Sequence, residues 1–423
     1  MALSVKPKTY TQEIHKIETD QIDHHALFIL DRLRAEGHEA YLVGGSVRDL
    51  LLGETPKDFD ISTSASPEEV KKLFRNCLLI GRRFRLAHVR FGKKIIEVST
   101  FRAGDPESDD LIVRDNVFGT AEEDVKRRDF TINGLFYDSE SECIIDYVDG
   151  YPDAAKRYLR VIGQPYVRFK QDPVRMIRLL KFKARFGLDI DPDAHQALLE
   201  CRSEIVKSAS ARILEELLRM LESGSSAPFF KLMADHGILE HILPLLSDFL
   251  ETPEGNEVIS YLEELDRSIK EPHNPHLDRP VLLACLIFPL YEQRIKTRYI
   301  DREKSPHLGV LFEEGLDLMD DLFNPFFRFP RRLKGQVGSI LSNQYRMTPL
   351  SPEKNRRIRV PNFPEFPYAV QFFGLRASLH VELIPIKEKW ESALEARGIT
   401  GPVPQKRPRK RRRRRGPPKS QDA

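Results

Sequence analysis

The sequence has few cysteines and no long apolar run. It contains four widely separated cysteines and no C-x-x-C pair: Cys77, Cys143, Cys201 and Cys285. This spacing argues against a zinc site or disulfide framework and favours reduced thiols in a cytoplasm. The longest apolar run, residues 281–290, is far shorter than the roughly 20 residues of a membrane span. Residues 1–16 lack the apolar segment of a secretory signal, so we expect a cytoplasmic protein without membrane association.

Charge of one sign is concentrated at the C-terminal end. The 423 residues include 67 Lys and Arg and 64 Asp and Glu, for a formal net charge of +3. Residues 401–423 alone carry +9, which leaves −6 for the first 400 residues. This tail cannot bury a core, so we expect it to be disordered. Basic arms of this kind bind nucleic acid without sequence preference, and Arg411, Arg412 and Arg413 are its candidate RNA-binding residues. A nuclear localisation signal is the alternative interpretation.

Hydrophobic periodicity divides the chain into a mixed part and a helical part. Residues 1–20 are polar and are expected to be frayed. Residues 22–33, 46–52 and 67–76 show helical features, whereas 40–43, 56–63 and 89–101 indicate strands. From about residue 165 only helical spacing follows. The sequence therefore predicts an α+β fold, with a mixed α/β head followed by an all-α region.

Two aspartates form the strongest candidate for a metal site. In a strand, residues i and i+2 point to the same face, so Asp58 and Asp60 can converge on one divalent cation. Two aspartates in a surface turn are common, and this pair alone is a weak signal. Combined with the run Gly44-Gly45-Ser46-Val47-Arg48-Asp49, it favours two-metal phosphoryl transfer.

Glycines and arginines nearby suit a triphosphate. Gly44 and Gly45 precede an expected helix N-terminus, where backbone N–H groups can approach phosphates closely. Arg48 and Arg128 could add positive charge to the non-reacting oxygens. Asp129, which follows Arg128, is a candidate for a third acidic group or for orienting the sugar and phosphates. The alternative for residues 123–133 is a helix face joined by ion pairs.

A further pair could read a nucleobase. Asp172 precedes Pro173, so helix capping is the simple interpretation. However, Asp172 and Arg175 lie three residues apart on one helix face, and the carboxylate accepts while the guanidinium donates. Adenine and cytosine each present one donor and one acceptor, so this pair could template either base.

The segment 79–89 carries three arginines around one aromatic residue. Arg82, Arg83 and Arg85 are candidates for contact with phosphate and the RNA backbone, although a solvated basic turn is an equal alternative. His88, in the same segment, is more often structural than catalytic when considered alone.

Four motifs in order resemble the superfamily of bacterial poly(A) polymerases and tRNA CCA-adding enzymes. They are LVGGSVRDLLLG (42–53), KDFDIST (57–63), EEDVKRRDFTIN (122–133) and QDPVRMIR (171–178), and the resemblance spans roughly residues 20–225. The segment LIGRRFRLAHV (79–89) and the basic tail are similar to the poly(A) polymerase branch. One departure is Gln171, where the family usually has Glu, which removes a charge beside Arg175.

The resemblance implies a nucleotidyltransferase head of the polymerase-β type at 20–160, a helical neck at 161–230, an RNA-binding body at 231–400 and the tail at 401–423. It implies template-independent addition of AMP from ATP to RNA 3′ ends, with Mg²⁺ or Mn²⁺. The implied catalytic residues are Asp58, Asp60 and Asp129, with the first two on the metal. Glu97, on an expected strand, ranks below Asp129 as the third carboxylate. The implied nucleotide-binding residues are Gly44, Gly45, Arg48, Arg128, Asp172, Arg175 and Arg178.

Three alternatives compete with RNA polyadenylation. CCA addition to tRNA would use the same head. A dehalogenase-type phosphatase would match the D-x-D, but it requires an apolar strand before Asp58, where Thr55-Pro56-Lys57 stands. A non-catalytic RNA-binding protein with the same fold would explain the tail. RNA-decay proteins are conceivable partners that the sequence does not reveal.

Overall fold

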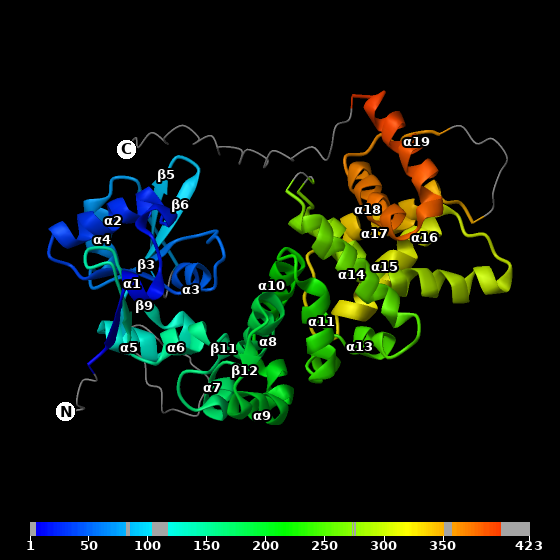
Figure 1. Ribbon diagram of the computed structural model, residues 1–423. Helices are drawn as coiled ribbons and strands as arrows, with labels where there is room; N and C mark the ends of the chain where they lie inside the picture. The colour runs from blue at the N-terminus through cyan, green and yellow to red at the C-terminus, as the bar shows by residue number, and fades with distance from the viewer. Residues whose placement is uncertain are drawn as a thin grey trace, which may run out of the picture.

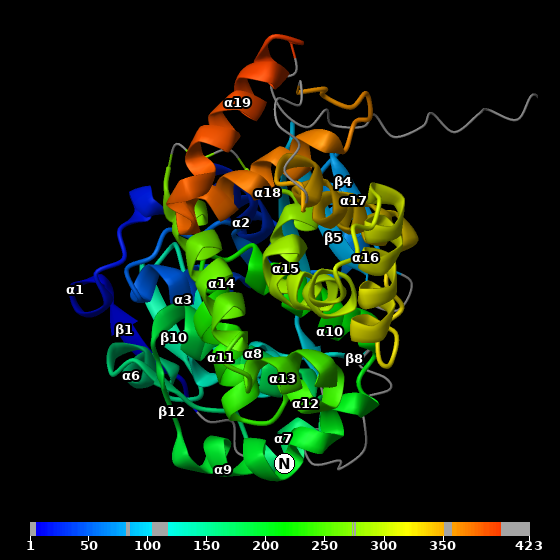
Figure 2. The ribbon, with the colours of Figure 1, turned by 90° about the vertical axis from the view of Figure 1, so that its right-hand side faces the viewer.

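A computed structural model of the protein describes residues 6–81, 85–103, 117–272, 274, 276–350 and 358–398. A mixed-sheet head lies at one end of the molecule and helices form the remainder (Figure 1). We call helices α7 to α10 the neck and helices α11 to α19 the body. Seen from the side, the body helices stand in front of the head (Figure 2). The predicted α+β class is confirmed.

Eight strands form the sheet of the head, in the order β1-β10-β9-β2-β3-β6-β5-β4. Strands β3 and β6 run parallel, and the other neighbouring pairs are antiparallel. Their bounds are β1 Lys8–Thr11, β2 Ala40–Val43, β3 Asp60–Thr63, β4 Cys77–Ile80, β5 Leu86–Phe91, β6 Lys94–Thr100, β9 Leu135–Asp138 and β10 Cys143–Asp146. Two short pairs lie outside this sheet: β7 Arg102–Ala103 with β8 Val117–Phe118, and β11 Tyr158–Leu159 with β12 Asp189–Ile190.

The two faces of the sheet have opposite character. Because side chains alternate along a strand, Ile61, Ile96 and Val98 point to one face and pack under helices α2 (His24–Ala35) and α4 (Pro67–Leu73). The residues between them, Asp60 and Glu97 among them, point to the other face. One face therefore holds the main core of the head, and the other carries Asp60 and Glu97 beside a smaller buried cluster that includes Val43 and Phe136.

The expectation of a frayed N-terminus is wrong for the described part of residues 1–20. Strand β1 pairs with β10 along its whole length, and His15 and Ile17 are buried. Helix α1 (Gln12–His15) and a 3₁₀ turn, η1 (Thr19–Gln21), follow. The polar sequence KTYT makes an edge strand, whose partner lies more than 130 residues away, so local periodicity could not reveal it.

Three short helices complete the head: α3 Gly45–Leu51, α5 Ala121–Lys126 and α6 Gly150–Ala155. Helix α5 starts with a capping box, in which Thr120 and Glu123 satisfy each other's backbone N–H groups. This cap fixes the start of the helix, and a 3₁₀ turn, η2 (Thr131–Asn133), follows its end. Between them lie Arg128 and Asp129, so their backbone is held on both sides.

The rest of the described chain is almost entirely helical. The neck comprises α7 Pro165–Gln171, α8 Val174–Phe186, α9 Pro192–Cys201, the turn η3 Arg202–Lys207 and α10 Ser210–Leu221. The body comprises α11 Ser226–Asp235, α12 Leu239–Ile242, α13 Pro244–Leu250, α14 Gly255–Lys270, α15 Arg279–Arg298, η4 Ile300–Arg302, α16 Leu308–Phe323, α17 Arg331–Met347, α18 Phe366–Leu379, η5 Val381–Leu383 and α19 Ile384–Glu395.

Neck and body share one hydrophobic core, which extends from Phe130 to Leu375. The predicted boundary between neck and body therefore does not separate two cores, and the exact domain division stays a prediction. Among the described helices, none is both long and apolar enough to span a bilayer.

Arginines of the neck anchor it to the head. Arg168 of α7 is buried, and its Nη2 lies 2.8 Å and 2.7 Å from the carbonyl oxygens of Arg127 and Arg128. Its Nη1 donates to Gln171 Oε1 at 3.1 Å. Burial and the nearby charge of Arg175 lower the pKa of Arg168 to about 10, so the group remains cationic at neutral pH. One guanidinium thus satisfies several carbonyls at the end of α5.

Replacing Arg168 by Met should destabilise this junction. The substitution keeps much of the apolar stem but leaves buried carbonyl oxygens without a donor, and hydrogen bonds from a charged group contribute about 1.5–3 kcal/mol. We expect the free energy of unfolding to fall by about 3 kcal/mol, measured by urea unfolding followed by circular dichroism. The exposed Lys156 offers a matched Met control, which should change stability by less than about 0.5 kcal/mol. Equal stability of the two variants would contradict the junction described above.

Candidate active site

Three carboxylates, those of Asp58, Asp60 and Glu97, lie on or next to the sheet face opposite the main core of the head. Their oxygens are not all within 4.8 Å of one another, because the one such group among the described residues is Asp23, His24 and His25. Asp60 begins β3, and its Cα partner on the parallel strand β6 is Glu97. Asp58 precedes the strand by two residues and is exposed, whereas Phe59 between them is buried. Asp58 and Asp60 therefore point away from the core, as the alternation predicted. Glu97 comes to them from the neighbouring strand.

The electrostatics of Asp60 show how closely these groups are placed. Loss of hydration, followed by the negative charges of Glu97 and Asp58, raises the pKa of Asp60 to about 6. Arg128 opposes the shift. A site that crowds carboxylates in this way is suited to a hard divalent cation, which prefers oxygen ligands and would relieve their repulsion.

The glycine pair borders two guanidinium groups. Gly44 has φ +66, and a Cβ built on it would lie 3.2 Å from Arg128 Nη1. A Cβ on Gly45 would lie 3.5 Å from Arg48 Nη2. Any larger residue at Gly44 would thus crowd Arg128 and adopt a strained backbone. The pair keeps space open beside these arginines, as expected for a phosphate-binding turn.

Arg128 and Arg48 differ in their availability. Arg128 is half-buried, is held by Asp124 at 2.8 Å and reaches Ser62 Oγ at 3.3 Å on the same sheet face as Asp60. Arg48 is buried, is bound to Asp49 and Asn133 and lies under the rings of Phe182 and Phe186 of α8. The positive charge of Arg48 is therefore already paired with Asp49 at the junction between α3 and the neck. The predicted contact of Arg48 with phosphates would require these bonds to break.

Asp129 is placed differently from the expectation. It is buried, and its Oδ1 accepts from Asn133 Nδ2 and from the N–H of Phe130, while Oδ2 lies 2.8 Å from Arg178 Nη2. Burial opposes its ionisation, but Arg178, Asn133 and Arg175 outweigh that effect and hold its pKa below the usual value. Asp129 thus orients neck arginines, and the carboxylate in register with Asp60 is Glu97. This geometry favours Glu97 over Asp129 as the third carboxylate, and the roles of both residues stay predictions.

The two residues of the predicted base-reading pair, Asp172 and Arg175, contact different partners. Both oxygens of Asp172 accept from Arg212 of α10, at 3.0 Å and 2.9 Å. Arg175 is buried, and its Nη2 donates to the carbonyl of Arg127 at 3.2 Å. Its Nη1 is also buried and has no hydrogen-bond partner in the described part of the chain. A buried, unmatched donor in a site of this kind points to a ligand that accepts a hydrogen bond.

Of the predicted RNA-binding arginines, the structure describes Arg85. Arg85 is exposed and pairs with Glu68. Arg82 and Arg83, and Arg411, Arg412 and Arg413 of the tail, lie outside the described residues.

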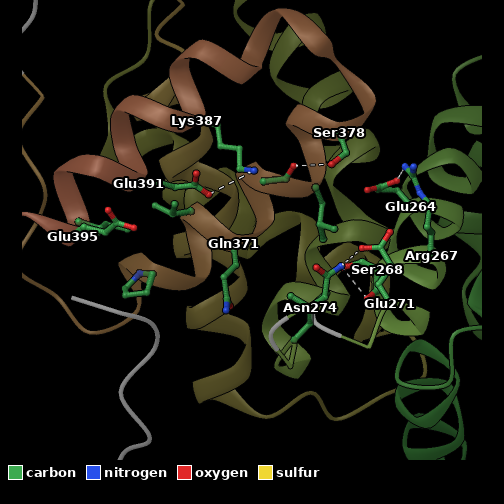
Figure 3. A pocket seen from close by; sticks show the side chains of 16 residues that line it. Glu264, Arg267, Ser268, Glu271, Asn274, Gln371, Ser378, Lys387, Glu391 and Glu395 are labelled. Atoms are coloured by element: carbon green, nitrogen blue, oxygen red, sulfur yellow. Dashed lines mark hydrogen bonds and ion pairs between the residues drawn. The ribbon is translucent and has the colours of Figure 1, made fainter. Parts of the chain in front are cut away.

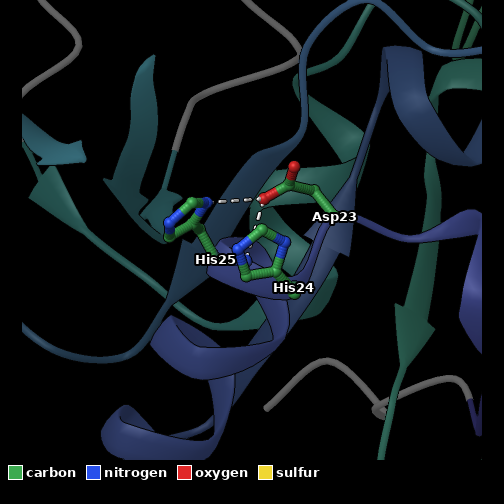
Figure 4. Close-up of side chains that lie close together, drawn as sticks. All are labelled: Asp23, His24 and His25. Carbon is green, nitrogen blue, oxygen red and sulfur yellow. Dashed lines mark hydrogen bonds and ion pairs between the residues drawn. The ribbon is translucent and has the colours of Figure 1, made fainter. Parts of the chain in front are cut away.

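Two other features do not join this site. Asp23, His24 and His25 lie close enough to suggest a metal group (Figure 4). However, Asp23 caps helix α2 by accepting from the N–H groups of His25 and Ala26, and its other oxygen pairs with Lys94, so capping explains it. A hollow of about 670 Å³ lies between α14, α18 and α19 of the body (Figure 3). Its lining includes both acids and bases, and some of them already pair, as Lys387 does with Glu391.

Sequence reasoning missed the role of Arg168 and the partner of Asp172. Arg212 lies on α10, and nothing in its local sequence marks Asp172 as its partner. Its contact with Asp172 joins two helices 40 residues apart. Arg168 stands three residues before Gln171, so a helical-face analysis of 165–171 was the one signal that could have linked them.

Known proteins resemble this chain over most of its length. Residues 40–160 match the family described as poly A polymerase head domain, and 187–250 match the family described as probable RNA and SrmB-binding site of polymerase A. Poly(A) polymerase I of Escherichia coli is 35% identical over 402 residues, covering 90% of this chain and 84% of that protein. A CCA-adding enzyme of Lactobacillus johnsonii is 35% identical but covers 51% of this chain and 54% of its own length. Among solved structures, the Bacillus stearothermophilus CCA-adding enzyme in complex with CTP has a TM-score of 0.62 at 24% identity, covering 88% and 82% of the two chains.

Replacing Asp60 by Asn should stabilise the metal-free protein. A raised pKa means that the folded state disfavours the ionised carboxylate, so stability is lost as pH rises through about 6. Because Asp60 is exposed and solvent screens it, we expect a gain of only about 1 kcal/mol at pH 8 in EDTA, measured by urea unfolding. The exposed Asp31 of α2 provides an Asp→Asn control that should change little. A loss of stability in the Asp60 variant would contradict the crowding of carboxylates.

Proposed function

The chain belongs to the poly(A) polymerase family of nucleotidyltransferases, and from this premise we propose how its residues add AMP from ATP to RNA 3′ ends. The enzyme is a template-independent polynucleotide adenylyltransferase that releases pyrophosphate. The observation that carries the assignment of its site is the register of Asp60 with Glu97 beside the Gly44-Gly45 turn, where the charges of Glu97 and Asp58 raise the pKa of Asp60.

Asp58, Asp60 and Glu97 are the residues that would hold divalent cations, Mg²⁺ or Mn²⁺. Their mutual repulsion, visible at Asp60, is the property that fits such ions. When bound, the cations lower the barrier by polarising the attacking hydroxyl and neutralising charge on the leaving pyrophosphate. Asp129 is a positioning residue, since it holds Arg178 and the backbone at Phe130.

Gly44 and Arg128 would bind the triphosphate of ATP. The glycine leaves room for phosphate oxygens next to the guanidinium, and Arg128 is anchored by Asp124 so that it need not be ordered on binding. Gly45 widens the same turn. Arg48 contributes by fixing α3 against the neck and is left out of the phosphate contacts.

Arg175 is the residue we assign to base recognition. Its buried Nη1 donor suits a ring nitrogen of adenine, which accepts a hydrogen bond. Arg212 donates to both oxygens of Asp172 and so fixes the orientation of this carboxylate, which keeps lone pairs free to accept from a base.

RNA is the second substrate. The family match over residues 187–250 supports an RNA-binding role for the neck and adjoining body. The ten basic residues of 401–423 supply charge for the phosphate backbone.

Extension of RNA with one nucleotide at a time tests the activity directly. With Mg²⁺, the protein should add long runs from ATP and little from CTP, GTP or UTP. Asp58→Asn should lower the rate by about 100-fold or more, because it removes a ligand of the ions, while RNA binding measured by filter retention persists. Incorporation limited to two C and one A on tRNA would identify a CCA-adding enzyme instead. Binding without any incorporation by the parent protein would favour a non-catalytic RNA-binding protein.

Replacing Arg175 by Met should relax the choice of nucleotide. Loss of a charged donor costs about 1.5–3 kcal/mol, and guanine carries an N–H where adenine has an acceptor nitrogen, so the preference for ATP over GTP in kcat/KM should fall by about 10- to 100-fold. Arg219 of α10, which is exposed and pairs only locally with Glu215, provides the matched Met control in the measured ratio. An unchanged preference in the Arg175 variant would remove this residue from base recognition.

A further inference from the structure

A row of polar side chains continues beyond the catalytic carboxylates. Strands β3, β6, β5 and β4 are neighbours in the sheet, and their Cα partners in one row are Asp60, Glu97, His88 and Leu78. Their strand neighbours Ile61, Val98 and Ala87 are buried in the core on the other face. His88 therefore stands directly next to Glu97, on the side away from Asp60.

The contact between these two side chains is specific. His88 Nε2 lies 3.3 Å from Glu97 Oε2. The side chain of His88 is 22% exposed and that of Glu97 is 42% exposed, so the imidazole is the better fixed of the two. Glu97 is repelled by Asp60 on one side and meets a ring nitrogen on the other. At this ion-pair distance the imidazole of His88 can restrain the Glu97 carboxylate.

The side on which His88 lies can be related to the reaction. Strand β2, which ends at the Gly44-Gly45 turn, flanks β3 on one side, and β6 flanks it on the other. In phosphoryl transfer the attacking and leaving oxygens lie roughly in line. If pyrophosphate leaves beside Gly44 and Arg128, the RNA 3′-hydroxyl enters from the side of β6 and β5. Arg85, at the start of β5, lies on this same side.

We propose that His88 is a positioning residue for Glu97, holding its carboxylate in place at the edge of the site that receives the RNA 3′ end. The inference deepens the proposed function and rests on the role assigned there to Glu97. His88 does not take part in the chemical step. It fixes one ligand, as neighbours of metal-binding carboxylates commonly do.

Metal binding by the full-length chain, without ATP or RNA, tests this role apart from activity. Mn²⁺ binding is followed by electron paramagnetic resonance for the parent protein, His88→Leu and His88→Gln. We expect Leu to weaken Mn²⁺ binding and to lower kcat by about 10-fold each, with KM for ATP unchanged. Gln, which retains an N–H donor, should restore most of both losses. His38, a histidine of the head near Glu69, offers a matched Leu control that should bind Mn²⁺ like the parent.

A double-mutant cycle separates positioning from a general structural effect. If His88 acts through Glu97, adding His88→Leu to Glu97→Gln should cause no further loss of Mn²⁺ affinity. Additive losses, or parent-like Mn²⁺ binding by His88→Leu, would overturn the proposal. If instead Glu97→Gln itself binds Mn²⁺ and extends RNA like the parent, the assigned role of Glu97 fails, and the inference fails with it. Thermal midpoints within a few degrees of the parent verify that each variant is folded.

Discussion

The site depends on guanidinium groups of the neck that are buried against the end of helix α5. Arg168 and Arg175 both donate to the carbonyl of Arg127, and Arg178 pairs with Asp129. Removing such cations from water is costly, and the cost is offset only when several acceptors are well placed. The last carbonyls of a helix offer such acceptors and carry partial negative charge. Arg128, proposed to bind phosphate, lies at this helix end. Arg175, proposed to recognise the base, bonds to the same helix end from the neck.

The same junction explains how Gln171 is accommodated where related proteins usually have Glu. The Oε1 atom of Gln171 accepts from Arg168 at 3.1 Å, and the charge of Arg168 is met by the carbonyls at the end of α5. A neutral side chain at position 171 is sufficient because the carbonyls of Arg127 and Arg128 accept the hydrogen bonds of the Arg168 guanidinium. The orientation of Arg175 then depends on Arg127, whose carbonyl it shares with Arg168, rather than on a charge at position 171.

Features set by local sequence could be predicted, and features set by the meeting of distant elements could not. Strand β2 has the expected bounds, and Asp60 points away from the core because alternation is a property of any strand. Asp58 precedes β3, so alternation alone does not fix its direction. The place of Glu97 beside Asp60 depends on the register of two parallel strands, which no local pattern records. Asp129 is buried at the junction with the neck, where it pairs with Arg178. The pairing of Asp172 with Arg212 is likewise a contact between separate helices.

The body contacts the neck helix that carries the partner of Asp172. Arg279, at the start of α15, bonds to Glu215 and Glu222 of α10, the helix that also carries Arg212. Since neck and body share one core, a shift of α15 would move α10 and with it the partner of Asp172. The surroundings of Arg175 therefore depend on contacts that extend to α15, well beyond the four motifs of the head and neck. This explains how enzymes with similar heads can select different nucleotides, because the helices behind the base-reading arginine are free to differ while the carboxylates that perform the chemistry stay the same.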